Sequence, residues 1–219
     1  MSANDFARLK PYLEPATLNL RDVLVEPEQP ITHVYFVEYG LASVVAMGLD
    51  GEPIEVGHIG REGMSGQSVL LGVDRTPDQT FIQVAGSALR MPVEALRAGM
   101  SESPVLHALL LRFVQTTIIQ LAQTALANGR FIVQQRLARW LLMCHDRLDG
   151  DDLPLTHEFL SLMLGVRRAS VTEALHLLEG VAIVKAGRGH VEVLDREKLE
   201  EIAGACYGVP EREYCRLIG

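Results

Sequence analysis

The sequence is poor in cysteine and in aromatic residues, and it has no long uninterrupted apolar segment. Its three cysteines, Cys144, Cys206 and Cys215, are too few for a disulfide scaffold and lack the spacing of a metal site. No apolar run approaches the roughly 18 residues that span a bilayer. The first residues lack the basic and apolar regions of a signal peptide. We therefore expect a soluble protein of the reducing cytoplasm, with no membrane partner.

An excess of positive charge is also missing. The chain has 20 Lys and Arg against 28 Asp and Glu, a net charge of −8. Residues 1–129 hold 8 basic and 14 acidic residues, net −6, whereas residues 130–219 hold 12 and 14, net −2. A nucleic-acid partner would therefore need a local basic patch rather than a bulk field. The 219 residues exceed one average domain of about 150 residues, which favours two small domains.

Residues 15 to 95 have the pattern of a β-structure. "HVYFVEYGLASVVAM" predicts two apolar strands joined at Tyr39-Gly40, Asp50-Gly51 is a hairpin signal, and "PIEVGHI" predicts the next strand. "TFIQVAG" and "SALRMP" predict a further strand pair. Short strands separated by glycine and proline indicate a sandwich, a jelly roll or a barrel.

From Pro104 the apolar period changes from two to about 3.6 residues, which predicts a helix. One stripe has the spacing of a coiled-coil seam: Leu111, Val114, Ile118, Leu121 and Ala125. A second apolar set lies off that seam: Leu106, Leu109, Leu110 and Phe113. Two apolar faces indicate a helix that packs on its own domain and on a partner, with a fully buried helix as the alternative. Asn128-Gly129 would end or bend this helix, and "FIVQQRLARWLLMCHDRL" predicts another, in which Cys144 is a small core residue.

Residues 155–195 predict two short helices and a hairpin. Thr156 is a suitable N-cap for the first helix, and Gly165 a suitable terminator. After a tight turn, "RRASVTEALHLLEG" predicts a second helix that ends at Gly180. "VAIVKA" and "HVEVLD", joined by "GRG", predict a two-stranded hairpin. Two helices around a glycine-containing turn, followed by a hairpin, form a winged helix-turn-helix.

The second of these helices has two different faces. At 100° per residue its core side carries Val171, Ala174, Leu175 and Leu178. Its outward side carries Ala169, Thr172, Glu173 and His176, with Arg168 at the edge. Small and polar side chains suit entry into a major groove, where arginine bonds guanine bidentately. Arg188 in the wing can reach a phosphate. A surface helix for protein interaction is the alternative.

The order of these segments resembles the cyclic AMP receptor protein / fumarate–nitrate reduction regulator (CRP/FNR) family over nearly the whole chain. The strongest local matches are "LTHEFLSLMLGVRRASVTEAL", "HIGREGMSGQSVLLG" and "QQRLARWLL". The resemblance implies an α+β fold with an N-terminal β-roll at 1–103, a dimerisation helix at 104–128 and a winged helix at 129–219. It also implies a homodimeric bacterial transcription regulator that senses a signal in the β-roll, binds a near-palindromic double-stranded DNA site and contacts RNA polymerase.

The family's DNA-reading residues carry over in part. Arg168 matches the arginine that begins the recognition helix, whereas the base-reading glutamate that follows is Ala169 and a later arginine is Glu173. Arg167 stands where the family has a capping serine. We therefore expect a shared docking mode and a different target sequence. The candidate DNA-binding residues are Arg167, Arg168, Ala169, Ser170, Thr172, Glu173, His176 and Arg188.

The sensor departs further from the family pattern. Gln67 and Gln79 replace the glutamate and arginine that hold the ribose and phosphate of a cyclic nucleotide, and a buried anion needs a countercharge. Leu121 and Ala122 replace the hydroxyl residues that meet the base. Cyclic AMP is therefore not the expected effector. The candidate pocket residues are Gly63, Gly66, Gln67, Ser68, Gln79, Thr80, Leu121 and Ala122.

Other cofactors and functions have less support. No N-terminal cysteine cluster is present for an iron–sulfur centre. His33 and His58 could ligate haem or a metal, and with Glu62 they are the candidates for a cupin-like enzyme, but their spacing matches no ligand motif. A regulatory subunit that acts on a protein partner is a further alternative. No catalytic motif stands out, so we predict neither an enzyme nor a metal site.

Overall fold

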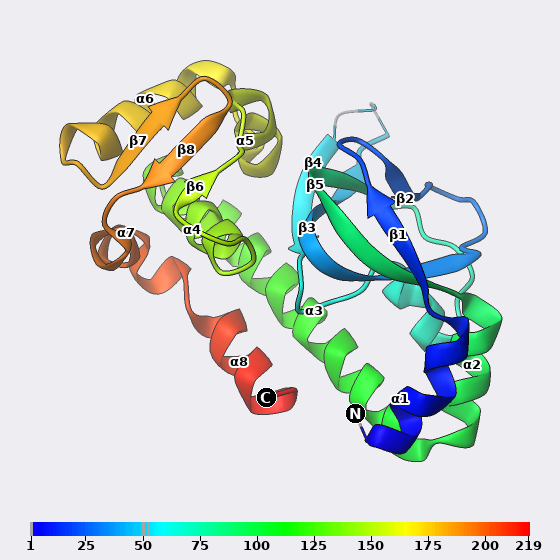
Figure 1. The fold of residues 1–219 in the computed structure, drawn as a ribbon. Coiled ribbons are helices and arrows are strands. Elements are labelled where there is room, and N and C mark those ends of the chain that lie inside the picture. The colour runs from blue at the N-terminus through cyan, green and yellow to red at the C-terminus, as the bar shows by residue number, and fades with distance from the viewer. Residues whose placement is uncertain (1, 50, 52) are drawn as a thin grey trace.

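The computed structural model describes residues 2–49, 51 and 53–219. Figure 1 shows a β-roll, a long helix beside it, and a helical C-terminal unit with a small hairpin, which is the α+β class expected from the sequence. The N-terminal part consists of α1 (Ala3–Leu9), η1 (Lys10–Tyr12), β1 (Glu14–Leu18), β2 (Val23–Val25), β3 (His33–Met47), β4 (Pro53–Ile59), η2 (Gln67–Leu71), β5 (Gln79–Pro92) and α2 (Val93–Glu102). The strands pair antiparallel in the order β1-β5-β3-β4, with β2 also on β5.

β3 and β5 are each one continuous strand, so the predicted breaks at Tyr39-Gly40 and between "TFIQVAG" and "SALRMP" are wrong. Gly40 has φ +98° and lies at a register shift rather than at a reversal. A Cβ on Gly86 would collide with the carbonyl oxygen of Tyr39. The two glycines therefore let paired strands bend while they stay in contact.

The predicted hairpin between β3 and β4 is present, because Met47 pairs with Pro53. Of its turn signal, Asp50 lies outside the described residues, and Gly51 has φ +80°.

α3 (Pro104–Arg130) begins where the sequence predicts, with the Ser103 hydroxyl accepting from the Leu106 backbone N–H at 3.2 Å. It continues through Asn128-Gly129 and ends at the extended Phe131, so the predicted end lies two residues early. By length and composition alone α3 could cross a membrane, contrary to the expectation that no such run exists. It packs instead against the β-roll and against α8.

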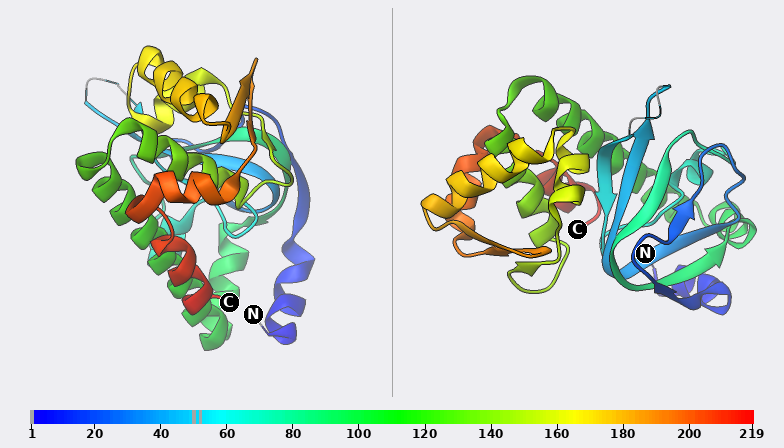
Figure 2. Two further views of the ribbon diagram at one scale, coloured as in Figure 1. Left: turned by 90° about the vertical axis from the view of Figure 1, so that its left-hand side faces the viewer. Right: turned by 90° about the horizontal axis from the view of Figure 1, so that it is seen from above.

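The C-terminal unit follows the predicted order of two helices and a hairpin. It consists of α4 (Val133–His145), β6 (Asp152–Leu153), α5 (His157–Leu164), α6 (Arg168–Gly180), β7 (Val184–Gly187), β8 (His190–Val193), α7 (Arg196–Ala203), η3 (Gly204–Cys206) and α8 (Val209–Leu217). β8 lies between β6 and β7. Figure 2 shows α8 running beside α3, where Arg112 Nε donates to the Leu217 carbonyl at 2.9 Å.

One apolar core contains residues of both the β-roll and the C-terminal unit. Leu41 and Val84 of the β-roll belong to the same buried cluster as Trp140, Met163 and Leu175 of the C-terminal unit. Cys144 is fully buried there, as predicted. The β-roll thus packs directly on the helix-turn-helix.

Candidate nucleic-acid interface and effector cavity

α5 and α6 form the helix-turn-helix. Thr156 Oγ1 accepts from the Phe159 backbone N–H at 3.2 Å, and Gly165 ends α5 with φ +58°. The core side of α6 is buried as predicted, at Val171, Ala174, Leu175 and Leu178. Burial of that stripe fixes which face of α6 points outward.

The outward face of α6 is open at its N-terminal end. The exposed residues there are Arg167, Arg168, Ala169, Glu173 and His176, while Ser170 and Thr172 are half-buried. Arg167 is the N-cap residue, and its side chain makes no capping hydrogen bond. The first N–H groups of α6 therefore keep their capacity to bind an anion such as a DNA phosphate.

Arg168 is held by α5 and, through it, by the β-roll. Its Nη2 lies 3.1 Å from Glu158 Oε2, and Arg21 Nη2 lies 3.1 Å from the other oxygen, Glu158 Oε1. Thr172 Oγ1 lies 3.2 Å from His157 Nδ1. Sequence reasoning missed these contacts, because nothing in the sequence signals that Arg21 approaches α5.

The wing is a tight hairpin. Gly187 pairs with His190, which leaves Arg188 and Gly189 as the two turn residues, and Gly189 has φ +83°. Arg188 is exposed at the tip. A flexible cation at this position can contact a backbone phosphate beside the groove that α6 would enter.

Two cavities lie between the β-roll and α3. One of about 200 Å³ is walled by β5, η2 and α3, and a larger one of about 360 Å³ extends to α8. Of the predicted pocket residues, the structure brings these to the cavities: Gly63, Gly66, Gln67, Ser68, Thr80 and Leu121. Gln79 and Ala122 line neither. Asp78, directly before β5, lines both cavities, and Thr80 of β5 lines the smaller one, whereas Gln79 between them points away because neighbouring residues of an extended chain alternate in direction.

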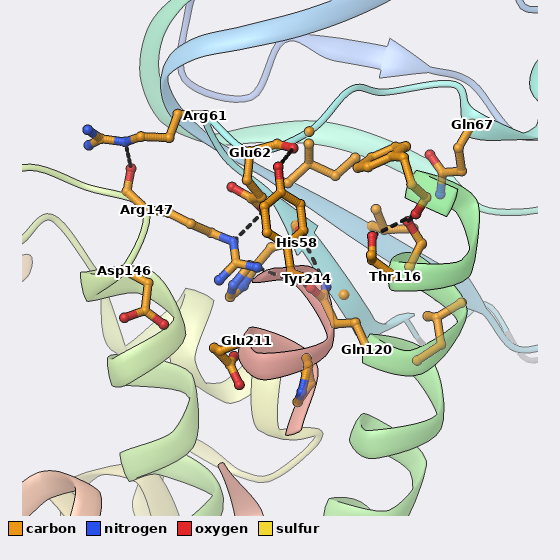
Figure 3. Close-up of a pocket in the computed structure, with 18 of the residues that line it drawn as sticks. His58, Arg61, Glu62, Gln67, Thr116, Gln120, Asp146, Arg147, Glu211 and Tyr214 are labelled. Carbon is orange, nitrogen blue, oxygen red and sulfur yellow. Dashed lines mark hydrogen bonds and ion pairs between the residues drawn. The ribbon is translucent and has the colours of Figure 1, made fainter. Parts of the chain in front are cut away.

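A buried polar cluster forms the inner wall of the larger cavity (Figure 3). Arg147 donates from Nε to Glu62 Oε1 at 2.6 Å and from Nη2 to Gln120 Oε1 at 3.2 Å. Burial opposes the charge on Arg147, but Glu62 holds its pKa above the ordinary value. Tyr214 donates to the Glu62 carbonyl at 2.9 Å. This cluster ties the β-roll, α3, α4 and α8 together.

The glycine-rich stretch after β4 explains how the cluster packs. A Cβ on Gly60 would lie 2.7 Å from Arg147 Cβ, and one on Gly63 would lie 3.1 Å from the Phe113 ring. Both distances are too short for ordinary packing, so glycine allows α3 and α4 to approach the loop. Sequence reasoning recognised the glycines but missed Arg147, whose partner Glu62 lies 85 residues away in the chain.

The two histidines considered as ligands lie in different surroundings. His33 Nδ1 lies 3.0 Å from the Thr32 hydroxyl. His58 is buried against Trp140, with ring centroids 4.9 Å apart, and Glu55 Oε1 lies 3.6 Å from its Nδ1. Within the described residues, no group of three His, Cys, Asp or Glu side chains could hold a metal ion. Glu55 was not anticipated from the sequence.

α3 presents part of its predicted seam to solvent. Leu111, Ile118 and Leu121 are exposed by 41%, 50% and 37%, and Ala125 is exposed as well. Val114 is instead buried in the β-roll core, so it is not part of the free stripe. The second apolar set packs inward, with Leu106 and Leu110 buried.

Comparison with known proteins agrees with this geometry. Residues 135–202 match the model of the Crp-like helix-turn-helix domain. The global nitrogen regulator of Nostoc sp. (strain PCC 7120 / SAG 25.82 / UTEX 2576) is 27% identical over 159 residues, which cover 68% of this chain and 71% of that protein.

Solved structures show the same fold at lower identity. FixK2 from Bradyrhizobium japonicum superposes with a TM-score of 0.77 at 17% identity, covering 88% of this chain and 98% of that one. A regulator of the crp/fnr family from Eubacterium rectale ATCC 33656 gives 0.72 at 16% identity, covering 93% and 95%.

A β-roll, a long helix and a Crp-like helix-turn-helix define a DNA-binding transcription regulator rather than an enzyme. Residues 135–202 thus form a Crp-like helix-turn-helix domain, and the chain shares its fold with regulators of the CRP/FNR family, which bind DNA and usually act as dimers.

Proposed function

We propose that this regulator is a homodimer that reads a near-palindromic site on double-stranded DNA through α6. The observation that carries the proposal is the open N-terminal face of α6, where Arg167 and Arg168 are exposed above a buried core stripe. In this arrangement Arg168 contacts a base and Arg188 in the wing contacts a phosphate. Ala169, Ser170, Thr172, Glu173 and His176 complete the surface that faces the groove.

Selection of bound sequences from a random DNA library tests this function directly. The purified full chain should enrich a near-palindrome whose half-sites lie about 34 Å apart, one helical turn. A footprint on the enriched sequence should cover both half-sites. Recovery of unrelated sequences, with equal affinity for selected and random DNA, would contradict the proposal.

The dimer forms through the α3 stripe of Leu111, Ile118, Leu121 and Ala125. Leu111, Ile118 and Ala125 recur every seven residues, so they remain on one side over four turns of the helix. α8 packs on another side of α3, where Arg112 bonds Leu217, and leaves the stripe uncovered. A second copy would bury these apolar side chains and align the two α6 helices with a two-fold site.

The β-roll senses a signal other than cyclic AMP. Gln67 lines both cavities, as expected of a pocket residue, but among the described residues neither cavity presents an arginine free to hold a phosphate. Arg147 is engaged by Glu62 and Gln120, and Arg61 by Asp149 at 2.7 Å. An anionic nucleotide would therefore lose its hydration without gaining a countercharge.

We assign the chain to three functional parts: a sensor at 1–103, a dimerisation helix at 104–128 and a DNA-binding part at 129–219. The shared core around Leu41 and Trp140 gives the sensor a direct mechanical connection to the DNA-binding part. A regulator of this type works in the cytoplasm, where its DNA and RNA polymerase are found.

A further inference from the structure

The two cavities beside α3 share one wall. Both are lined by Val44, Gln67, Asp78, Thr117 and Leu121. A molecule bound against this wall would touch the β-roll and α3 together. The chemical character of the wall therefore decides what kind of ligand the regulator can accept.

The cationic groups at these cavities are already occupied. Arg147 uses its nitrogens on Glu62, Gln120 and the Met143 carbonyl at 2.6, 3.2 and 2.9 Å. Arg61 donates to the Arg147 carbonyl and to Asp149. His58, the remaining basic residue, is fully buried, and burial holds its pKa well below the usual range. An anionic ligand therefore finds no available countercharge among the lining residues.

Asp78 on the shared wall differs from these arginines, because it is acidic and is not engaged in an ion pair within the described residues. It is the charged residue of the smaller cavity, all of whose lining residues lie in the described part of the chain. Its neighbour is Thr76, whose Oγ1 accepts from the Asp78 backbone N–H at 3.3 Å. Partial burial raises the pKa of Asp78, and the hydrogen bond with Thr76 acts against that change. Among the residues that the structure describes, the carboxylate thus lacks the cation that normally accompanies an acid in a half-buried position.

The rest of the smaller cavity suits an apolar body with a polar end. Val25, Val44, Leu71, Val114 and Ile118 supply apolar surface. Ser68, Thr76, Thr80 and Thr117 add hydroxyl groups to the lining, and Ser68 Oγ is buried without a hydrogen-bond partner in the described structure. Such a hydroxyl can accept from a bound N–H group.

From this arrangement we propose that the β-roll cavity binds a small organic cation, a primary amine with an apolar body, whose ammonium group pairs with Asp78. The ammonium would donate to the carboxylate and to Ser68, while the body lies against the aliphatic wall. Ile118 and Leu121 close the outer side of the cavity and belong to the exposed α3 stripe. A ligand bound in this cavity would therefore alter the packing of residues at the dimer seam. This regulatory meaning rests on the proposed function, whereas binding itself does not.

Three probes with the same phenyl-ethyl body and different charge test the proposal: phenethylamine (positive), 2-phenylethanol (neutral) and phenylacetate (negative). Calorimetry on the full chain without DNA should give phenethylamine a Kd of about 1 mM or tighter. The alcohol should bind more weakly and phenylacetate more weakly still. Agmatine serves as a second, longer amine that can reach into the larger cavity.

Variants separate the Asp78 contact from general charge effects. Asp78→Asn should weaken phenethylamine binding about tenfold or more, the factor that corresponds to about 1.4 kcal/mol, and Asp78→Glu should retain most of it. Asp74→Asn is the matched control, because Asp74 lies in the same segment, pairs with Arg75 at 3.3 Å and lines neither cavity. Thermal melts without ligand establish that each variant is folded.

The proposal is overturned if phenylacetate binds as tightly as phenethylamine, if Asp78→Asn binds the amine as the parent does, or if neither amine binds at a Kd of about 1 mM. Binding of each variant to the selected DNA is measured separately. If a variant loses amine binding but still binds DNA, the proposed function is retained. If it loses DNA binding but still binds the amine, the cavity assignment is retained.

Discussion

Arg168 at the start of the recognition helix is ion-paired with Glu158 of the preceding helix at 3.1 Å. The other oxygen of the same carboxylate holds Arg21 of the β-roll at 3.1 Å, and Arg21 has φ +71°, an uncommon backbone conformation for a residue with a side chain. One carboxylate therefore connects the sensor with the arginine expected to read a base. Because this guanidinium has to turn toward guanine to bond it, DNA binding competes with the Glu158 contact.

Glu158→Gln should therefore bind DNA more tightly than the parent. All three side chains are more than half exposed, so each pair contributes about 0.2–1 kcal/mol. We expect an affinity gain of roughly 1.5- to 5-fold, measured by titration of labelled operator. Glu197→Gln removes the same charge from an exposed site on α7 and is the control. An equal gain in both variants would show a general charge effect instead.

Substitutions of Arg168 and of Arg188 should weaken different components of DNA binding. Arg168→Ala should cost about 1–3 kcal/mol at the operator and relax preference at one position per half-site. Arg188→Ala should weaken all sequences about equally and reduce the salt slope by about one unit. Arg167→Ala should behave like Arg188→Ala, since Arg167 lies at the N-cap, closer to the backbone.

Binding to the operator and to single-base variants over a salt series distinguishes these roles. If Arg168→Ala loses the same affinity for operator and random DNA, Arg168 contacts a phosphate. Specificity would then rest on Thr172, Glu173, His176 and DNA shape.

The DNA-reading elements could be predicted from the sequence because their signals are local. Thr156, Gly165 and the apolar stripe of α6 act within a few residues, and all three lie where expected. The continuous strands were missed because Gly40 and Gly86 resemble turn residues, and their role as a bend depends on pairing between distant segments. Asp78 and the Glu62–Arg147 pair were missed for the same reason, since tertiary contact rather than sequence spacing brings them to a cavity.

The α3 stripe should control the oligomeric state. Leu111→Lys combined with Ile118→Lys would bring like charges together across the seam, and a buried unpaired charge costs several kcal/mol. We expect the double variant to sediment as a monomer and to lose cooperative binding to both half-sites. Val105→Lys places the same charge at an exposed apolar position off the stripe and should remain dimeric. A dimeric double variant would refute the seam assignment.

Cyclic AMP should neither bind nor change DNA affinity. The Asp78 carboxylate faces the cavities, and the lining arginines are engaged by Glu62 and Asp149, so the phosphate meets repulsion without a countercharge. Calorimetry should show a Kd weaker than about 1 mM, less than about 4 kcal/mol of binding free energy. Micromolar binding would contradict this expectation and would also count against an amine in the same cavity.

The buried pair Glu55 and His58 should make the free energy of unfolding depend on pH. Burial raises the pKa of Glu55 to about 8, from 4.5 in an unfolded chain. Burial also lowers the pKa of His58 well below its ordinary 6.5, with Arg147 and Arg139 adding to the effect. Both side chains are therefore neutral in the folded protein near pH 7, and their 3.6 Å contact joins two uncharged groups.

Between pH 4.5 and 6.5, the titrations of Glu55 and His58 change the free energy of unfolding in opposite directions. Above pH 6.5, only the titration of Glu55 changes it. Folded Glu55 keeps a proton that the unfolded chain has lost, so its contribution is fully present below pH 4.5 and is lost as pH rises to about 8. Folded His58 lacks a proton that the unfolded chain binds, so its contribution falls as pH drops below 6.5. Between pH 6.5 and about 8 the Glu55 effect remains alone, at up to about 1.4 kcal/mol per pH unit for one proton.

Glu55→Gln should remove this slope, because the amide has nearly the same shape and no titrating proton. Urea unfolding of the parent and the variant at several pH values between 6.5 and 8 measures it, and the variant should gain relative to the parent as pH rises. Glu94→Gln, at an exposed position on α2, should leave the parent's slope unchanged. If Glu55→Gln keeps the parent's slope, Glu55 is ionised in the folded protein, with the buried Arg139 or a protonated His58 as its countercharge.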